Sequence, residues 1–128
     1  MNVLLDTHAF RWWIDGDPIP PPAFDALSDP RNMVWLSAAS AWEITIKASL
    51  GKRRLPDRAA RFVEEQRQRN AFAWLPIEAS ALDILQDLPF HHRDRFDRLL
   101  VAQAIAKACT LVSADPAMGA SPVKTIWS

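Results

Sequence analysis

Several residue types are scarce in this chain of 128 residues, and each scarcity excludes a class of protein or site. With one cysteine, Cys109, the chain can form neither an intramolecular disulfide nor a cysteine-based zinc site. Three glycines leave little room for a glycine-rich phosphate loop or a dinucleotide-binding fingerprint, and neither motif occurs. Tyrosine is absent, whereas the six tryptophans are expected mainly to pack in the core or between subunits.

Charge and hydropathy exclude further classes of protein. Fifteen basic and fifteen acidic residues cancel, which excludes a strongly cationic nucleic-acid-binding surface but not local basic patches. No apolar run approaches the roughly 18 residues of a membrane span, and the N-terminus lacks the pattern of a signal peptide. The composition is that of a globular protein with one domain, residues 1–128, and we expect it in the cytoplasm.

Short apolar runs alternate with helical segments along the chain. Strands are predicted at 2–5, 33–36, 72–75, 110–113 and 123–126. Helices are predicted at 7–14, 23–28, from Ser37 or Ser40 to about 50, 56–69, 78–88 and 96–108, with a proline-rich break at 17–22. The alternation predicts an α/β fold, a three-layer α/β/α sandwich with a mainly parallel central sheet flanked by helices.

Two carboxylates stand where predicted strands end. Asp6 follows the first strand, and Asp115 lies two residues beyond the strand that ends at Ser113. Ligands collect at the carboxyl ends of parallel strands, so two acids there could hold a cation. Taken singly, each acid is better explained as a helix N-cap.

Glu43 and Asp97 also have structural explanations. Ser40 and Glu43 have the spacing of a capping box, and Lys47 is placed to form an ion pair with Glu43. Asp97 opens the apolar helix at 96–108, where the helix dipole favours a carboxylate. Asp94, three residues earlier, is the better N-cap, which leaves Asp97 available for another role.

The four acids could act together as one site if they face the same cleft. They would raise one another's pKa unless a cation were bound. Oxygen ligands without a cysteine cluster suit Mg²⁺ or Mn²⁺, which can stabilise charge on a phosphoryl group, so the predicted reaction is phosphodiester hydrolysis. The histidines, His8, His91 and His92, lack the spacing of a zinc site and are expected on the surface or in loops.

Four longer segments carry a resemblance to a known family. They are residues 4–8 (LLDTH), 40–47 (SAWEITIK) with Gly51-Lys52, 88–104 (LPFHHRDRFDRLLVAQA) and 111–115 (LVSAD). In order and spacing they resemble the motifs of PIN-domain ribonucleases, and in particular the VapC-type toxins of bacterial type II toxin–antitoxin modules. The resemblance covers almost the whole chain and implies a PIN-like fold.

The resemblance also implies a mechanism and partners. A member of that family is a Mg²⁺- or Mn²⁺-dependent endoribonuclease, toxic through cleavage of cellular RNA, and its metal-binding acids match Asp6, Glu43, Asp97 and Asp115. Thr7 and Ser113 match hydroxyl positions that orient the carboxylates or water. The implied partners are the RNA substrate, a cognate antitoxin whose C-terminal segment enters the cleft, and a second copy in a homodimer.

Basic residues near these motifs are weaker candidates for contacts with the RNA backbone, because a solvated surface explains them equally well. They are Lys52, Arg53, Arg54, Arg93, Arg95 and Arg98, of which Arg98 could instead pair with Asp94. Two other functions stay open. A haloacid-dehalogenase-like phosphatase would use Asp6 as nucleophile, although His8 stands where its second acid belongs. A catalytically inactive PIN-like binding module would not need all four acids.

Overall fold

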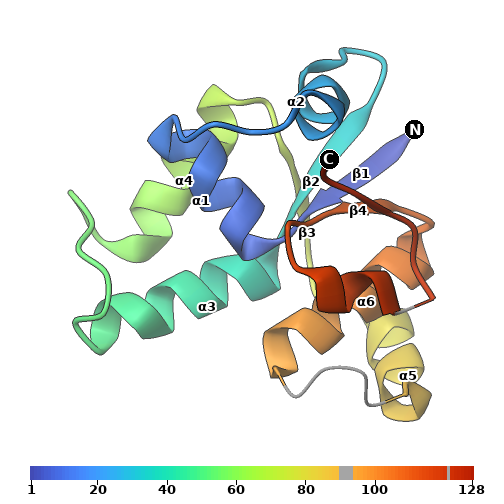
Figure 1. The fold of residues 1–128 in the computed structure, drawn as a ribbon. Coiled ribbons are helices and arrows are strands. Elements are labelled where there is room, and N and C mark those ends of the chain that lie inside the picture. The colour runs from blue at the N-terminus through green and yellow to red at the C-terminus, as the bar shows by residue number, and fades with distance from the viewer. Residues whose placement is uncertain (90–93, 121) are drawn as a thin grey trace.

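One sheet of five strands, in the order β3-β2-β1-β4-β5, forms the centre of the molecule (Figure 1). The computed structural model describes residues 1–89, 94–120 and 122–128. The strands are β1 (Asn2–Leu5), β2 (Met33–Ser37), β3 (Ala73–Leu75), β4 (Thr110–Val112) and β5 (Thr125–Ile126). Every pairing between neighbouring strands is parallel, so the predicted α/β fold with a parallel sheet is confirmed.

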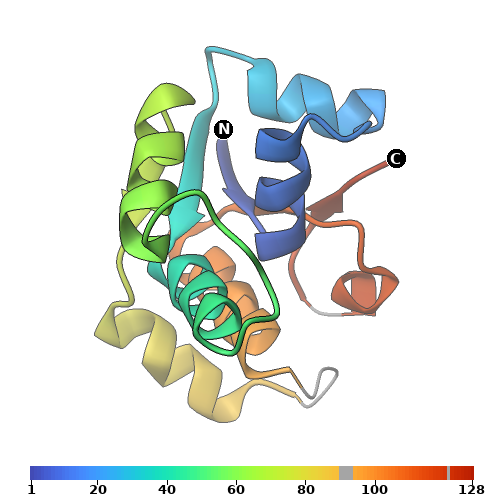
Figure 2. The same ribbon diagram turned by 90° about the vertical axis from the view of Figure 1, so that its left-hand side faces the viewer.

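Helical segments connect the strands and cover both faces of the sheet (Figure 2). They are α1 (Thr7–Asp15), α2 (Pro21–Ser28), α3 (Ala38–Ser49), α4 (Ala59–Arg69), α5 (Ala79–Asp87), α6 (Arg95–Lys107) and the short 3-10 helix η1 (Pro116–Ala120). Among the described residues, no helix is both long and apolar enough to cross a bilayer.

The central strand β1 is buried on both sides. Val3 and Leu5 belong to one apolar cluster, with residues of α1, α2, α3 and α4, whereas Leu4 belongs to a second cluster with residues of α6. Successive side chains of a strand point to opposite faces, so the two clusters are the two layers of packing against the sheet. This arrangement is the predicted three-layer sandwich, with α1, α2 and α4 on one side and α5 and α6 on the other (Figure 1).

The start of α3 differs from the predicted capping box. Ser37 is the N-cap, and its hydroxyl oxygen accepts a hydrogen bond from the amide of Ala39 at 2.9 Å. Ser40 therefore lies inside the helix, where it is buried and accepts a hydrogen bond from the hydroxyl of Thr7 at 3.0 Å. The prediction that Ser40 and Glu43 form a capping box is wrong. Ser37, one turn earlier, caps the helix by accepting a hydrogen bond from an amide of the first turn.

The beginnings of three other helices can be compared with the sequence predictions. Asp94 is the N-cap of α6, as predicted, and accepts hydrogen bonds from the amides of Phe96 at 2.8 Å and Asp97 at 3.1 Å. Helix α4 begins at Ala59, three residues later than predicted from Pro56. Helix α2 begins at Pro21, earlier than predicted, because the amides of a first turn need no partner within the helix and proline is tolerated there.

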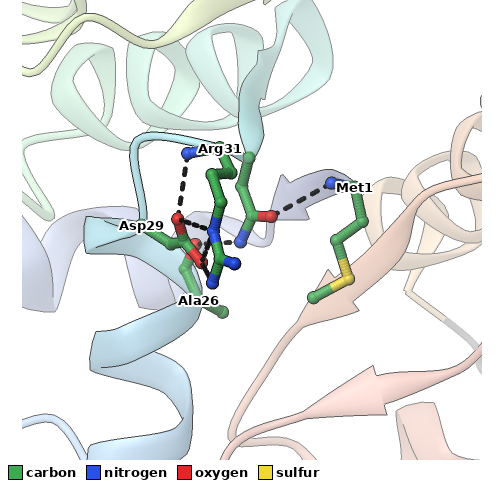
Figure 3. A network of polar contacts seen from close by, with 5 residues as sticks. Met1, Ala26, Asp29 and Arg31 are labelled. Carbon is green, nitrogen blue, oxygen red and sulfur yellow. Dashed lines mark hydrogen bonds and ion pairs between the residues drawn. The ribbon is translucent and has the colours of Figure 1, made fainter.

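A polar network fixes the turn before β2, next to the amino ends of the strands (Figure 3). The side chain of Asn32 accepts a hydrogen bond from the ammonium group of Met1 at 3.0 Å and donates one to the carbonyl oxygen of Ala26 at 2.9 Å. Beside it, the guanidinium of Arg31 binds Asp29 at 2.8 Å and lowers the pKa of that carboxyl to about 2. These contacts stabilise the edge of the sheet opposite the predicted site.

The two-sided core predicts a large difference between two leucines. Leu100 in α6 is fully buried, whereas Leu82 in α5 is 50% exposed. We expect Leu100→Ala to lower the free energy of unfolding by about 2–5 kcal/mol, because it leaves a cavity in the core. The matched control, Leu82→Ala, should change it by no more than about 0.5 kcal/mol. Urea denaturation followed by circular dichroism measures both, and equal losses would contradict the described packing.

Candidate active site

The four predicted acids come from elements that follow the carboxyl ends of β1, β2 and β4. Asp6 directly follows β1 and is the N-cap of α1, and Asp115 lies just before η1. Glu43 lies in α3, which follows β2, and Asp97 lies in the first turn of α6. The charges of Asp6, Glu43 and Asp115 all act on Asp97 and raise its pKa. The fold therefore gathers the four acids into one electrostatic cluster.

Asp6 is the most deeply buried of the four, with 4% of its surface exposed. One of its oxygens, Oδ1, accepts a hydrogen bond from the amide of Ala9 at 2.7 Å, as expected of an N-cap. Burial raises the pKa of Asp6, and the charge of Asp115 raises it further. Hydrogen bonds from Ser113 and Ala9 act in the opposite direction without cancelling this shift. Asp6 is thus both a helix cap and a member of the cluster.

Asp97 has a pKa that is raised well above its ordinary value. Burial is the main cause that raises its pKa, to about 7, and the charge of Asp94 is the next largest. The other three acids of the cluster add to the shift. A carboxyl group with a pKa near 7 is only partly ionised at neutral pH, which is the behaviour expected of acids that lack a neighbouring cation.

Glu43 has a cation of its own on the next turn of α3. Its carboxylate lies 3.0 Å from the Nζ atom of Lys47, so the predicted pair is confirmed. The side chain of Glu43 is only 13% exposed, and the pair is therefore more enclosed than a solvated surface pair. Its partial burial fits the apolar residues that flank Glu43 in the sequence.

Arg11 of α1 is a charged neighbour of the cluster that the sequence did not reveal. Burial and the positive charge of Arg53 lower the pKa of Arg11, whereas the charges of Asp15 and Glu43 raise it. The Nε atom of Arg11 is buried and has no hydrogen-bond partner within the part of the chain that the structure describes. No local motif signals this residue, because its approach to Glu43 depends on the packing of α1 against α3.

The two predicted hydroxyl residues have different surroundings. The side chain of Ser113 is hydrogen-bonded to Asp6, and its Oγ atom accepts a hydrogen bond from the amide of Asp115 at 3.1 Å. Ser113 therefore connects two of the acids. Thr7 donates to Ser40 instead, and this contact joins the start of α1 to α3.

The weaker candidates for RNA contacts occupy varied positions. Arg53 binds Asp15, with 3.3 Å between the charged atoms, and Lys52 and Arg54 are exposed in the segment that follows α3. Arg95, the first residue of α6, is exposed as well. Arg93 lies outside the described residues, as do His91 and His92.

Arg98 contacts the end of a neighbouring helix. Its guanidinium donates hydrogen bonds to the carbonyl oxygens of Pro89 at 3.0 Å, Leu88 at 3.2 Å and Leu85 at 3.4 Å. Carbonyl groups at a helix C-terminus lack partners within the helix and favour a nearby cation. These contacts connect α6 to the C-terminal end of α5.

The charge and donor chemistry of the cluster fit a divalent metal ion. Its donors are carboxylate oxygens, the ligands that Mg²⁺ and Mn²⁺ prefer, and the raised pKa of Asp97 shows negative charge that a cation would balance. Within residues 1–89, 94–120 and 122–128, no group of three or more Asp, Glu, His or Cys side chains is already arranged to hold an ion. Three of the acids instead have partners nearby in the chain. Asp6 accepts a hydrogen bond from the amide of Ala9, Asp115 accepts one from the amide of Ala117, and Glu43 forms an ion pair with Lys47.

Three of the solved structures with a similar fold are named as VapBC and come from bacteria. The chain resembles VapBC2 from Rickettsia felis, solved bound to a DNA fragment from its promoter, with a TM-score of 0.76 and 17% identity over 100% of both chains. It also resembles VapBC-1 from nontypeable Haemophilus influenzae (TM-score 0.70, 15% identity, 98% of this chain and 97% of that one). A third is VapBC-5 from Mycobacterium tuberculosis (TM-score 0.62, 18% identity, 98% and 97%). At these identities the likeness is one of fold.

The sequence comparisons give two results. No curated protein sequence matches the chain. A family profile described as PIN domain matches residues 3–120, which include all four acids of the cluster. The chain belongs to the PIN-domain family.

Proposed function

We propose that the protein is a metal-dependent endoribonuclease toxin of the VapC type. The observation that carries the proposal is the cluster of four acids, in which burial, and after it the charges of neighbouring acids, raise the pKa of Asp97 to about 7. Membership of the PIN-domain family supports a nuclease, and the likeness of fold to VapBC structures supports a toxin. RNA as the substrate is what the resemblance of the sequence motifs to PIN-domain ribonucleases implies.

Asp6, Asp97 and Asp115, together with Glu43, would hold Mg²⁺ or Mn²⁺. When bound there, the ion would stabilise negative charge that develops on the scissile phosphate. Ser113 would fix the relative positions of Asp6 and Asp115, to both of which it is hydrogen-bonded. Thr7 would act less directly, since its hydroxyl bonds to Ser40 and holds α1 against α3.

The proposed partners are an antitoxin, a second copy of the chain and RNA. The compared structures are named as VapBC, and one is described as bound to DNA from the promoter. We expect a gene for a small protein to lie next to the gene for this chain. When the two are co-expressed, the small protein should co-purify with the chain. Purification of this chain alone from such a co-expression would contradict the antitoxin proposal.

The first prediction concerns Asp6, the most deeply buried of the four acids in the proposed site. Asp6→Asn should lower the rate of RNA cleavage in Mg²⁺ on the order of 100-fold or more, because it removes a charged ligand. The control is Asp83→Asn, which changes an exposed acid of α5. Total RNA is incubated with each protein, and the ends are mapped for 3′-hydroxyl and 5′-phosphate groups. Cleavage by Asp6→Asn at the parent rate would exclude the proposed site.

The second prediction uses the raised pKa of Asp97 in the absence of metal. Ionisation of Asp97 between about pH 4 and pH 7 disfavours the fold, because its pKa is about 7 in the folded chain and 3.8 for the ordinary group. In EDTA at pH 8, Asp97→Asn should therefore raise the free energy of unfolding by about 1–2 kcal/mol, a figure that allows for partial exposure. The gain should vanish below about pH 3, where Asp97 is protonated in both the folded and the unfolded state.

Urea denaturation with Asp83→Asn as control measures this difference. Addition of Mg²⁺ should stabilise the parent more than Asp97→Asn, since a ligand that binds only the folded state adds to its stability. A variant that is less stable than the parent at pH 8 without metal would show that Asp97 is not repelled by its neighbours.

A further inference from the structure

An aromatic pair lies beside two of the acids. The rings of Trp42 and Phe96 have centroids 4.9 Å apart and planes at 78°, an edge-to-face contact. Trp42 directly precedes Glu43 in α3, and Phe96 directly precedes Asp97 in α6. The pair therefore joins the two helices that carry these acids, and each ring is one residue before an acid along the chain.

Much of Trp42 faces solvent despite its size, since 47% of its surface is exposed. The edge-to-face contact with Phe96 restrains the indole on one side and leaves the remainder of the ring open. A flat aromatic side chain that is held in place loses little conformational entropy when another ring stacks on it.

Charge around the site gives RNA little attraction. The acids repel phosphate groups, and two nearby cations already bind carboxylates, Lys47 with Glu43 and Arg53 with Asp15. The formal net charge of the chain is zero, so no strong general attraction for a polyanion exists. Exposed cations lie on the segment that follows α3 and at the start of α6, namely Lys52, Arg54 and Arg95. Uncharged contacts, of which base stacking is the strongest in single strands, would add to the binding free energy that these cations contribute.

We propose that Trp42 stacks on an unpaired nucleobase next to the scissile phosphate, with Phe96 as its positioning residue. The inference rests on the proposed ribonuclease function. A phosphodiester bound at the four acids would bring its neighbouring nucleotides to helices α3 and α6, the two helices that the aromatic pair joins. A base inside a duplex is already stacked on both faces and cannot use the indole, so the substrate is RNA with an unpaired segment.

Binding without turnover tests this role directly. Asp6→Asn is the background, so that the RNA stays intact, and the probe is a fluorescein-labelled single-stranded oligoadenylate in EDTA, followed by fluorescence anisotropy. Trp42→Ala should weaken binding by about tenfold. Trp42→Phe should keep the affinity within about threefold, whereas Trp42→Leu, which keeps apolar bulk but no aromatic ring, should bind as weakly as the alanine variant.

Trp74 supplies the matched control. It is 40% exposed and lies on the outer strand β3, two strands away from β1. Trp74→Ala should leave the affinity unchanged. In the Asp6→Asn background, equal affinities with and without Trp42→Ala, including undetectable binding by both, would overturn the stacking role. Unchanged affinity of the Trp42→Leu variant would overturn it as well.

Two further results would also overturn it. One is an equal loss of affinity for a blunt RNA duplex, which has no unpaired base to offer. The other is a dimeric parent that becomes monomeric in light scattering when Trp42 is replaced, because a second copy would then cover the indole. Failure of the unaltered protein to cleave RNA in Mg²⁺ would refute the proposed function separately, since the binding comparison needs neither metal nor turnover.

Discussion

The parallel direction of the strands is the constraint on which the rest of the structure depends. Because β1, β2 and β4 all end at the same edge, the residues after them are delivered to one place. The amide of Asp6 donates to the carbonyl oxygen of Val112 at 3.0 Å, which fixes the end of β1 against the end of β4. Ser113 then connects Asp6 to Asp115. The acids meet because the strands run together, although they are far apart in the sequence.

A fold that concentrates carboxylates needs stability from elsewhere. Burial, together with repulsion by neighbouring acids, raises the pKa of Asp97 to about 7 and so disfavours the folded chain at neutral pH. The opposing contribution comes from β1, whose residues Val3, Leu4 and Leu5 are fully buried between two apolar layers. Local rules are satisfied in the core and strained at the acidic edge, a division typical of proteins that keep a functional site at some cost in stability.

The predicted capping box at the start of helix α3 is wrong because a competing hydrogen bond is not visible in the sequence. Ser40 has the right spacing to Glu43 for a capping box, but Ser37 caps the helix one turn earlier, and Ser40 is buried against Thr7. Asp6 shows that a helix cap does not exclude a place in the acidic cluster. It caps α1 through the amide of Ala9 and also contributes its charge to the cluster.

The sequence by itself determined the class of fold and the positions of the acids relative to the strands. Apolar runs and helical periodicity are local properties, so they predicted β1, the long apolar helix α6 and its N-cap Asp94. The approach of Arg11 to Glu43 and the contact of Trp42 with Phe96 were decided only by the tertiary structure. Each joins residues of different helices, and distances between helices depend on how side chains pack across the whole core, which no local pattern records.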